Sequence, residues 1–513
     1  MKFEHLWLLM EWRAAQSPDS EMIVDERGRR VSFGEFRSRA ERVAAALSVE
    51  HGVGSGTVVM WQLPTTVEAL VLTVALARLG AIQNPVMPTF NARDLEFVVS
   101  QTGTKLMITT SEWSGKDLSG AIREVAAKMP DIELISLDGD LPESPAPAPA
   151  FDVADGSARW IFYTSGTTSK PKGARHTDAS VLASSWWMGE SVQCTSEDRV
   201  GMAFPVAHIG GCGTWLGASL LYGLTLIIDS EFDIERTVEL QQRERVTLAG
   251  SGVVFIHLYL QAQRALPPGE RLFPQIRAMT SGAAPKPPTL HADVKREMGG
   301  VGVLSGYGMT EAPILAMSSN GDNDLVLAAA EGKLSPEIDA KIAGRDGTSL
   351  PLGEIGELCV KGPQVMQGYV DTALNDSAFD EDGYLRTGDL ASLDADGNLT
   401  IHGRLKDIII RKGENISARA IEDELVEHPD VADVAVVGLP HPEWGEVACA
   451  VVTLRATATG LAMEDVTAFL DERDFPKRQR PERLEVVEDL PRTPTGKLAK
   501  DVLRRNFGTP SMS

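Results

Sequence analysis

The sequence predicts an α/β fold, and three features support this. Its 513 residues exceed what one hydrophobic core usually holds, so several folding units are expected. Before residue 353, apolar strand-like runs alternate with helical patterns, as in parallel sheets covered by helices. After it, short runs punctuated by Gly and Asp indicate antiparallel strands. We expect a large N-terminal domain of parallel α/β sheets with a small β-barrel-like subdomain, and a small α+β C-terminal domain.

The N-terminal elements follow from local signals. Ser32 and Glu35 stand three residues apart, which is the spacing of a helix capping box. Residues 142–150, PESPAPAPA, read as a surface linker. The other expected elements are strand 58–63, helix 69–80, strand 81–86, strand 158–163, polar loop 164–173, a helix from about Thr177, and a strand–loop–helix unit at 272–288.

The C-terminal part has a different texture. The segments GEIGELCVKG (353–362) and DADGNLTIHGR (394–404) predict short antiparallel strands. Beyond them we expect helix 421–428, strands 431–440 and 447–454, and helix 463–473. The predicted domains are therefore residues 1–404 and residues 405–513, and the C-terminal domain has a normal size.

Composition excludes several classes of protein. The formal net charge is −23, so the chain lacks the basic field that DNA or an anionic membrane surface would attract. The four cysteines stand far apart, which argues against a zinc knuckle or a disulfide framework and favours a reducing cytoplasm. The apolar run at residues 6–10 is too short for the core of a signal peptide.

Residues 200–228 contain no charged side chain and are long enough to span a bilayer. They also contain Pro205, His208 and six glycines, which suit a continuous lipid-facing helix poorly. We therefore expect a buried segment of the large domain and no stable membrane span.

The densest chemical signal is YTSGTTSKPKG at residues 163–173. Its glycines let backbone N–H groups approach an anion, its hydroxyls add donors and its lysines add charge. A strand precedes the loop and a helix is expected to follow it, which would favour an anion at the helix N-terminus. The motif is not a Walker A loop, because Gly173 is followed by Ala174. A plain polar surface loop is the alternative for this motif taken alone.

This motif closely resembles the signature of the adenylate-forming superfamily, which includes acyl- and aryl-CoA synthetases, peptide-synthetase adenylation domains and luciferases. Ser169 stands where the family usually has Gly. The resemblance implies that the loop binds ATP through Thr164, Ser165, Gly166, Thr167, Thr168 and Lys172.

Further motifs match the family in the same order. SGAAP (281–285) and GYGMTE (306–311) resemble its adenine and magnesium motifs, YLRTGD (384–389) its ribose motif, and HGRLKD (402–407) its interdomain hinge. The resemblance implies that nucleotide is bound by Gly282, Ala283, Ala284, Gly306, Tyr307, Gly308, Met309, Asp389 and Arg404. Glu311 would hold Mg²⁺, which prefers carboxylate, phosphate and water.

Three more assignments rest on the same resemblance. Lys406 would be the hinge of a mobile C-terminal domain, and Lys497 in PRTPTGK would be the catalytic lysine. Lys412, Gly413 and Glu414 would line the CoA tunnel. Taken alone, Lys406 and Lys497 read as solvated charges, so these roles depend on the whole series of motifs.

The identity of the acid substrate is the feature that the sequence determines least. His208 matches a family position beside the substrate carboxylate and joins Thr310, Glu311 and Lys497 as catalytic candidates. Peptide synthetases usually carry an Asp where this chain has Pro205, so an amino acid is not expected. The candidate lining residues are Trp187, Ile209, Gly210, Gly213, Val253 and Met309. Close helix packing is an equally good explanation for the glycines.

The leading hypothesis is an AMP-forming acid–CoA ligase that uses ATP, Mg²⁺ and CoA. Its acid is expected to be fatty, alicyclic or steroid-type, with an aryl acid as the alternative. Two other hypotheses are an adenylating enzyme that loads a separate carrier protein or oxidises its adenylate, and a nucleotide-binding regulator. The presence of both Glu311 and Lys497 argues against a regulator. The sequence leaves the oligomeric state open, a homodimer included.

Overall fold

The computed structural model describes residues 4–129, 131–137, 139–151, 156–164, 171–203, 205–282, 284, 286–287, 289–412, 414–492 and 497–508. The described residues form two compact units. The first holds those of 1–164, 171–339 and 361–379, and the second those of 340–360 and 380–513. The boundary predicted after residue 404 falls inside the second unit and stays a prediction.

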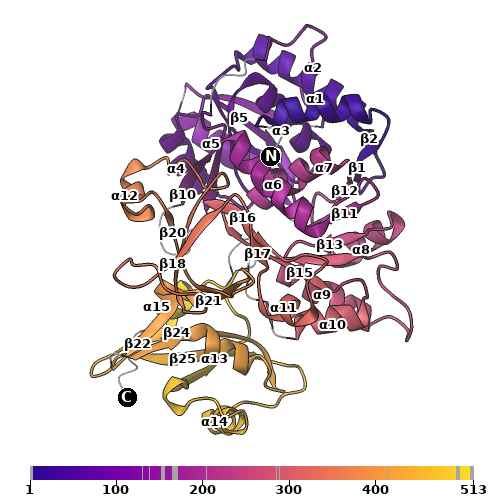
Figure 1. Cartoon of the computed structure of the whole chain (residues 1–513). Helices are drawn as coiled ribbons and strands as arrows, with labels where there is room; N and C mark the ends of the chain where they lie inside the picture. Colours follow the sequence, from indigo (N-terminus) through magenta and orange to yellow (C-terminus); the bar gives the residue numbers. More distant parts are fainter. Residues whose placement is uncertain are drawn as a thin grey trace. The chain divides into compact units, whose positions relative to one another are not determined.

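A nine-stranded sheet forms one layer of the first unit (Figure 1). Its strands are β1 (Glu21–Asp25), β2 (Arg30–Ser32), β11 (Arg199–Met202), β12 (Thr225–Ile228), β13 (Leu248–Gly250), β14 (Ala278–Ser281), β15 (Val303–Met309), β16 (Ala312–Met317) and β17 (Lys333–Leu334). Their order is β17-β16-β15-β14-β13-β11-β12-β1-β2. The pairs from β1 through β12 and β11 to β15 are parallel, while β2, β16 and β17 pair antiparallel at the two edges.

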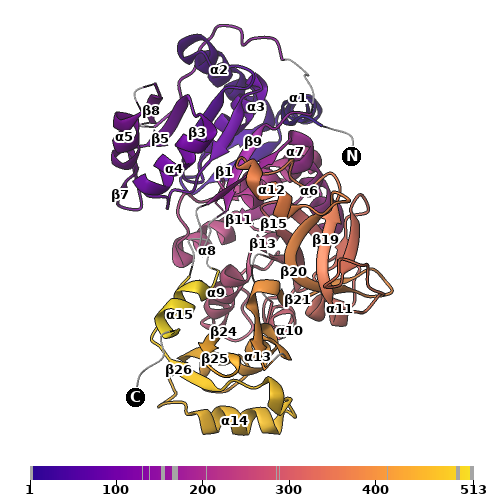
Figure 2. The same cartoon turned by 90° about the vertical axis from the view of Figure 1, so that its left-hand side faces the viewer.

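A six-stranded sheet forms a second layer. Its strands are β3 (Val58–Gln62), β4 (Ile82–Pro85), β5 (Leu106–Thr110), β8 (Glu133–Leu137), β9 (Trp160–Thr164) and β10 (Lys172–His176), and β6 (Glu112–Trp113) and β7 (Lys116–Asp117) form a separate small hairpin. The order is β10-β9-β4-β3-β5-β8, parallel except for the β9–β10 pair. Helices α4 (Ala92–Thr102) and α5 (Leu118–Lys128) lie beside β5 (Figure 2).

The remaining helices of the first unit are α1 (Leu6–Gln16), α2 (Phe33–His51), α3 (Val67–Leu79), α6 (Asp178–Val192), the π-helix η1 (Ile209–Leu216), α7 (Gly217–Tyr222), α8 (Ile234–Arg243), α9 (Val253–Arg264), α10 (Leu290–Glu297), α11 (Asp324–Ala329), the 3-10 turn η2 (Thr372–Leu374) and α12 (Asn375–Ala378). The predicted capping box is confirmed at α2, where Ser32 and Glu35 exchange two hydrogen bonds. Every residue of α3 is buried. A helix that is apolar nearly all round belongs inside a core, and α3 lies there.

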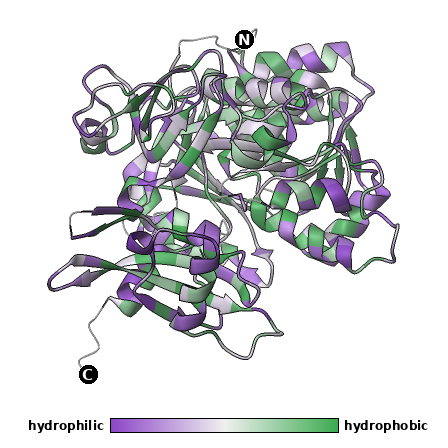
Figure 3. Cartoon of the chain, turned by 60° about the horizontal axis from the view of Figure 1, so that its bottom comes forward, coloured by the Kyte–Doolittle hydropathy of each residue, from purple (hydrophilic) through white to green (hydrophobic). Residues whose placement is uncertain are grey.

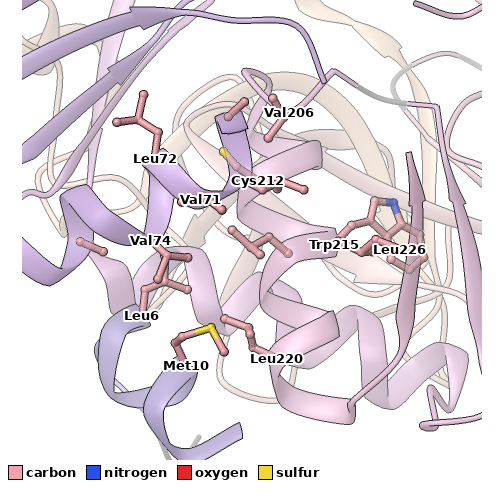
Figure 4. Packing of buried hydrophobic residues seen from close by; sticks show 14 of the residues in the cluster. Leu6, Met10, Val71, Leu72, Val74, Val206, Cys212, Trp215, Leu220 and Leu226 are labelled. Atoms are coloured by element: carbon pink, nitrogen blue, oxygen red, sulfur yellow. The ribbon is translucent and has the colours of Figure 1, made fainter. Parts of the chain in front are cut away.

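The core of the first unit joins segments far apart in sequence. Figure 4 shows Leu6 and Met10 of α1 packed with Val74 of α3 and Leu220 of α7. The charge-free segment 200–228 thus supplies buried core elements, because η1 and α7 connect β11 to β12. Among the described helices, none is long and apolar enough to cross a membrane.

The second unit contains two smaller sheets. One has the order β18 (Asp339–Ala343), β19 (Gly356–Lys361), β20 (Leu385–Leu393) and β21 (Leu399–Arg404). The other contains β22 (Ile408–Arg411), β23 (Glu414–Ser417), β24 (Val431–His441), β25 (Gly445–Leu454) and β26 (Arg483–Val486), with helices η3 (Leu405–Asp407), α13 (Ala418–Leu425), α14 (Met463–Glu472), η4 (Lys477–Gln479) and α15 (Lys500–Phe507). In Figure 3 green hydrophobic residues are frequent on the strands and purple ones on the loops.

The predicted α/β class is confirmed, with one local correction. The loop after β9 was expected to lead directly into a helix, but it leads into β10, which pairs antiparallel with β9 from Lys172 opposite Thr164 to His176 opposite Trp160. Helix α6 begins only at Asp178. The loop therefore joins two strands of a hairpin, and the argument that placed an anion at a helix N-terminus does not apply to it.

Candidate active site

The turn between β15 and β16 carries Thr310 and Glu311. Glu311 is only 6% exposed. Its carboxylate accepts a 2.7 Å hydrogen bond from the Tyr369 hydroxyl, and its carbonyl accepts one of 2.8 Å from the N–H of Met366. Burial, and next the charge of Glu311, raise the pKa of Tyr369 above its ordinary value, so this hydroxyl remains a donor. Within the described part of the chain, no Lys, Arg or His forms an ion pair with the Glu311 carboxylate, whose side-chain partner is the Tyr369 hydroxyl.

The residues present fit a magnesium ion that arrives with a nucleotide. The described ranges contain no cluster of three or more His, Cys, Asp or Glu side chains that could hold a metal by themselves. Mg²⁺ in nucleotide sites usually takes one or two carboxylates and completes its shell with phosphate and water. One buried carboxylate at Glu311 meets that requirement.

His176 fixes the backbone of the same turn. One ring nitrogen lies 2.8 Å from the carbonyl oxygen of Thr310, and the other lies 3.0 Å from the hydroxyl of Ser180. The imidazole is fully buried, and this burial lowers its pKa to about 4. The neutral ring therefore donates to Thr310 and accepts from Ser180. His176 joins the end of β10 to the turn that carries Glu311.

We expect the substitution His176→Gln to make stability less sensitive to acid. An unfolded histidine titrates near 6.5, whereas His176 stays neutral down to about 4. The unfolded chain therefore binds the proton first, so this residue's contribution is complete above 6.5 and is lost as the pH falls toward 4, by up to about 3 kcal/mol. Urea unfolding of both chains at about pH 7 and pH 5 measures the difference. Equal acid sensitivity of the two chains would contradict this expectation.

The two ends of the predicted phosphate loop lie opposite each other. Thr164 ends β9 and Lys172 begins β10, and the two residues are paired in register. The Lys172 ammonium lies 5.4 Å from the centre of the Tyr369 ring. Ser165, Gly166, Thr167 and Thr168 lie outside the described residues.

The predicted adenine segments run side by side. Strands β14 and β15 are parallel, with Ser281 opposite Ser305. A Cβ on Gly282 would lie 3.0 Å from the carbonyl oxygen of Gly306, and a Cβ on Gly308 would lie 2.4 Å from the backbone nitrogen of Ile314. At Gly308 the backbone leaves no room for a side chain, whereas at Gly282 an added Cβ would make a tight contact. Tyr307 and Met309 are half-buried on the same segment, as is Ala284 after β14, while Ala283 is outside the described residues.

A small pocket in the first unit brings His208 and Thr310 together. Its wall is largely apolar and comprises Pro85, Val86, Met87, Phe90, Phe162, Tyr163, Ala207, His208, Ile209 and Thr310. His208 caps η1, where its Nδ1 accepts a 3.0 Å hydrogen bond from the N–H of Gly210. π-Helices are rare and often occur at functional sites. Two sequence candidates, His208 and Ile209, therefore share one pocket with the catalytic candidate Thr310.

The other predicted pocket residues are not part of this wall. A Cβ on Gly213 would lie 3.0 Å from Cγ1 of Ile209, and Val253 packs in the hydrophobic cluster around α9. Gly210 belongs to η1, and Trp187 lies half-buried on α6. At Gly213, helix packing accounts for the missing side chain. The sequence analysis did not predict that residues of segment 85–90 line this pocket. The position of this segment at the end of the predicted strand 81–86 could have indicated it.

In the second unit, the ribose and hinge motifs meet across a strand pair. Asp389 on β20 lies opposite Arg404 on β21, and their side chains form a 2.9 Å ion pair. The Asp389 side chain is 5% exposed and that of Arg404 is 48% exposed. The Asp389 N–H also donates to Thr387 Oγ1 at 3.1 Å. The two predicted nucleotide contacts are thus brought together.

The turn η3, which carries the predicted hinge residue Lys406 and which we call the hinge turn, is joined to the last helix by ion pairs. Arg504 on α15 lies 2.6 Å from Asp407 and 2.8 Å from Asp501, and the Lys406 ammonium lies 3.9 Å from Asp501. Lys497 lies half-buried just before α15.

The predicted CoA hairpin lies on β22 and β23. Lys412 and Glu414 flank Gly413, which lies outside the described residues. The Lys412 ammonium lies 3.8 Å from the centre of the Trp444 ring, and the backbone N–H of Lys412 donates to the Trp444 carbonyl at 2.8 Å. Trp444 therefore fixes one side of this hairpin.

Two family models match the chain. The model for AMP-binding enzymes covers residues 10–370, and the model for the AMP-binding enzyme C-terminal domain covers residues 420–497. Together they include the first and the last motif of the series and leave residues 371–419 between them.

Curated relatives match over nearly their whole length. The long-chain-fatty-acid–CoA ligase FadD13 of Mycobacterium tuberculosis is 31% identical over 98% of this chain and 98% of its own. The medium-chain fatty-acid–CoA ligase of Escherichia coli (strain K12) is 28% identical, over 96% of this chain and 89% of its own. A feruloyl-CoA synthase from an Amycolatopsis species is 30% identical, over 97% and 98%.

Solved structures give the same result. ATP-bound MatB from Rhodopseudomonas palustris has a TM-score of 0.88 at 29% identity and covers 98% of this chain and 99% of its own. The o-succinylbenzoate CoA synthetase MenE from Bacillus subtilis, in complex with ATP and magnesium ion, has a TM-score of 0.82 at 26% identity, with coverages of 96% and 98%. The chain therefore belongs to the adenylate-forming superfamily of AMP-binding enzymes, in the branch of AMP-forming acyl-CoA synthetases.

Proposed function

We propose that this acyl-CoA synthetase activates an apolar carboxylic acid of the fatty, alicyclic or steroid type and transfers the acyl group to CoA. The observation that carries the proposal is the chemistry of the lining of the small pocket, where His208 and Thr310 lie beside apolar side chains. The described wall residues carry no Asp, Glu, Lys or Arg. The FadD13 and E. coli relatives are fatty-acid–CoA ligases by name and the Amycolatopsis relative is a feruloyl-CoA synthase by name, so the relatives support CoA ligation of an acid and the acid class rests on the pocket.

The first half-reaction joins the acid to AMP. A carboxylate oxygen of the acid attacks the α-phosphorus of ATP and forms a new P–O bond. The bond from the α-phosphorus to the oxygen that bridges to the β-phosphate breaks, and pyrophosphate leaves. Catalysis of this kind depends on alignment and neutralisation of phosphate charge. Lys172 and the Thr310 hydroxyl would face the phosphates, and Lys497 would bridge the acid and the α-phosphate. Mg²⁺, when bound at Glu311, supplies further charge neutralisation.

The nucleoside would be held by residues from the predicted adenine, ribose and hinge motifs. The backbone of 282–284 and 306–309 would enclose the adenine, with the Tyr307 ring as an aromatic face. Asp389 would accept from the ribose hydroxyls, and Arg404, already paired with it at 2.9 Å, would keep that carboxylate oriented. His208 would face the acid carboxylate from the pocket.

The second half-reaction passes the acyl group to sulfur. The CoA thiol attacks the acyl carbonyl, forms the thioester bond and expels AMP. The anhydride must be kept from water during this exchange. We propose that residues 405–513 turn about Lys406, so that Lys497 withdraws and the hairpin with Lys412 and Glu414 takes its place.

Acid-dependent ATP–pyrophosphate exchange tests the substrate class. The panel contains straight-chain fatty, alicyclic, steroid-type, aryl and amino acids. Aryl acids are included because Phe90, Phe162 and Tyr163 line the pocket and favour this second candidate. We expect exchange with the apolar aliphatic or alicyclic acids and none with amino acids. Exchange with aryl acids alone would replace the proposed class by the second candidate. Release of AMP that does not depend on CoA would contradict CoA as the acceptor.

A further inference from the structure

The segment 366–370, which we call the strap, connects strand β10 to the turn that carries Glu311. The Arg175 N–H donates to the carbonyl of Gly368 at 3.0 Å, and the Val370 N–H donates to the carbonyl of Gly173 at 2.8 Å. These bonds fix the strap to β10, the strand that follows the phosphate loop. At its other end, the Met366 N–H donates to the Glu311 carbonyl at 2.8 Å. The strap is thus bonded both to β10 and to the turn that carries Glu311.

Tyr369 is the residue of the strap whose side chain makes the same connection. Its hydroxyl donates to Glu311 Oε1 at 2.7 Å, and its ring lies 5.4 Å from the Lys172 ammonium. The residue is 5% exposed, and its N–H donates to Asn375 Oδ1 at 2.8 Å, so backbone and ring are both held. Tyr369 therefore lies between the lysine and the carboxylate proposed to face the phosphates.

The chemistry of the donor matters. An Arg or Lys in this place would orient the Glu311 carboxylate but would also neutralise it. A phenol orients the carboxylate and leaves its negative charge to a metal ion. Groups that hydrogen-bond to a metal-binding carboxylate typically change metal affinity or activity by about 10- to 100-fold when they are removed.

We propose that Tyr369 is the positioning residue of the magnesium site: its hydroxyl holds the Glu311 carboxylate in place while its ring holds the Lys172 ammonium. This inference rests on the proposed role of Glu311 as the metal-facing carboxylate. It adds a residue outside the motifs of the sequence analysis. Tyr369 acts through Glu311 and Lys172 and does not itself take part in bond making.

The experiment separates the two functions of the tyrosine. Binding of α,β-methylene-ATP is measured by calorimetry with Mg²⁺ and with EDTA, without acid or CoA. Tyr369→Phe removes only the hydroxyl, and Tyr369→Leu removes the ring as well. Tyr222→Phe is the matched control, because the Tyr222 hydroxyl also donates to a glutamate, Glu190, at 2.8 Å.

We expect wild type and Tyr222→Phe to bind the analogue more tightly with Mg²⁺ than without it. In Tyr369→Phe, the increase in affinity that Mg²⁺ gives should shrink by about 10-fold or more. The affinity in EDTA should stay unchanged, which shows that this variant is folded. Tyr369→Leu should weaken binding in EDTA as well, because Lys172 loses its ring partner. A parallel measurement with Mn²⁺, followed by its electron paramagnetic resonance, should show the same loss of bound metal.

Glu311→Gln distinguishes failure of this inference from failure of its premise. If Glu311→Gln loses the magnesium gain and Tyr369→Phe keeps it, the positioning role of Tyr369 is refuted and Glu311 retains its assignment. If Glu311→Gln keeps the full gain, the metal assignment of Glu311 is itself wrong, and the role of Tyr369 is refuted with it. A loss in both variants, with Tyr222→Phe unaffected, supports both.

Discussion

Replacing Lys497 with alanine is expected to reduce acid-dependent ATP–pyrophosphate exchange by about 100-fold or more. A single preorganised electrostatic donor commonly contributes that much to a transition state. The segment around the lysine is fixed from both sides. The Ala499 N–H donates to the Pro491 carbonyl at 2.7 Å, and Arg492 and Leu498 form an isolated β-bridge. These contacts hold the backbone next to Lys497.

The same variant should keep the second half-reaction. Chemically prepared acyl-AMP and CoA are mixed with the variant, and thioester is followed directly. We expect a rate close to wild type, because the lysine is proposed to leave before this step. Lys477→Ala, which removes an exposed lysine of the same unit, is the control for loss of charge. Unchanged exchange in Lys497→Ala would contradict the catalytic role of this lysine.

The sequence predicted most accurately those features that depend on residues close together in the chain. The capping box at Ser32 and Glu35 needs only residues three apart, and its two hydrogen bonds are present. The helix expected at 69–80 is α3, which starts two residues earlier at Val67, because Thr66 caps it through the N–H of Ala69. Local patterns thus identified the elements, while the cap set the exact start.

Strand β10 was missed because its evidence is not local. The letters KGARH combine Gly with three basic residues and read as a loop. Their strand character comes from partners elsewhere, namely β9 on one side and the strap, through the Ala174–Tyr369 bridge, on the other. Strand β9 is close in the sequence, but the strap is far away, and pairing with either leaves no periodic signal in a five-residue segment.

The site was predicted in part for the same reason. Motif order made Thr310 and Glu311 candidates, and this stays a prediction, but nothing near them points to Tyr369, which is 58 residues away from Glu311. Gly210 and Gly213 were predicted to line the acid pocket, with close helix packing as an equally good explanation. At Gly213 the neighbouring side chains of Ile209 and Val181 occupy the space beside the glycine. A missing side chain in the sequence can mean a cavity or a close contact, and only packing distinguishes them.

Lys406→Pro is expected to spare adenylate formation and to reduce transfer to CoA by about 100-fold, the loss that a small misplacement of reacting groups can cause. Proline fixes its own φ and restricts Leu405 before it, so a turn that must change conformation would be locked. The Lys406 side chain is 53% exposed, and its ammonium lies 3.9 Å from Asp501, so its removal should disturb little packing. Lys406→Ala separates loss of the charge from loss of backbone freedom and should retain both half-reactions.

If Lys406 is the hinge, the ion pairs of Arg504 would let one movement serve both half-reactions. Arg504 holds Asp407 of the hinge turn at 2.6 Å, and its helix α15 follows Lys497 directly, so the turn, the helix and the lysine segment are coupled within one unit. A rotation about Lys406 would then withdraw Lys497 and advance the 411–417 hairpin in a single movement. Pyrophosphate exchange and thioester formation, measured on the same preparation of Lys406→Pro, test this. Loss of both half-reactions to the same degree would contradict the hinge, because a locked turn should stop only the step that needs the movement.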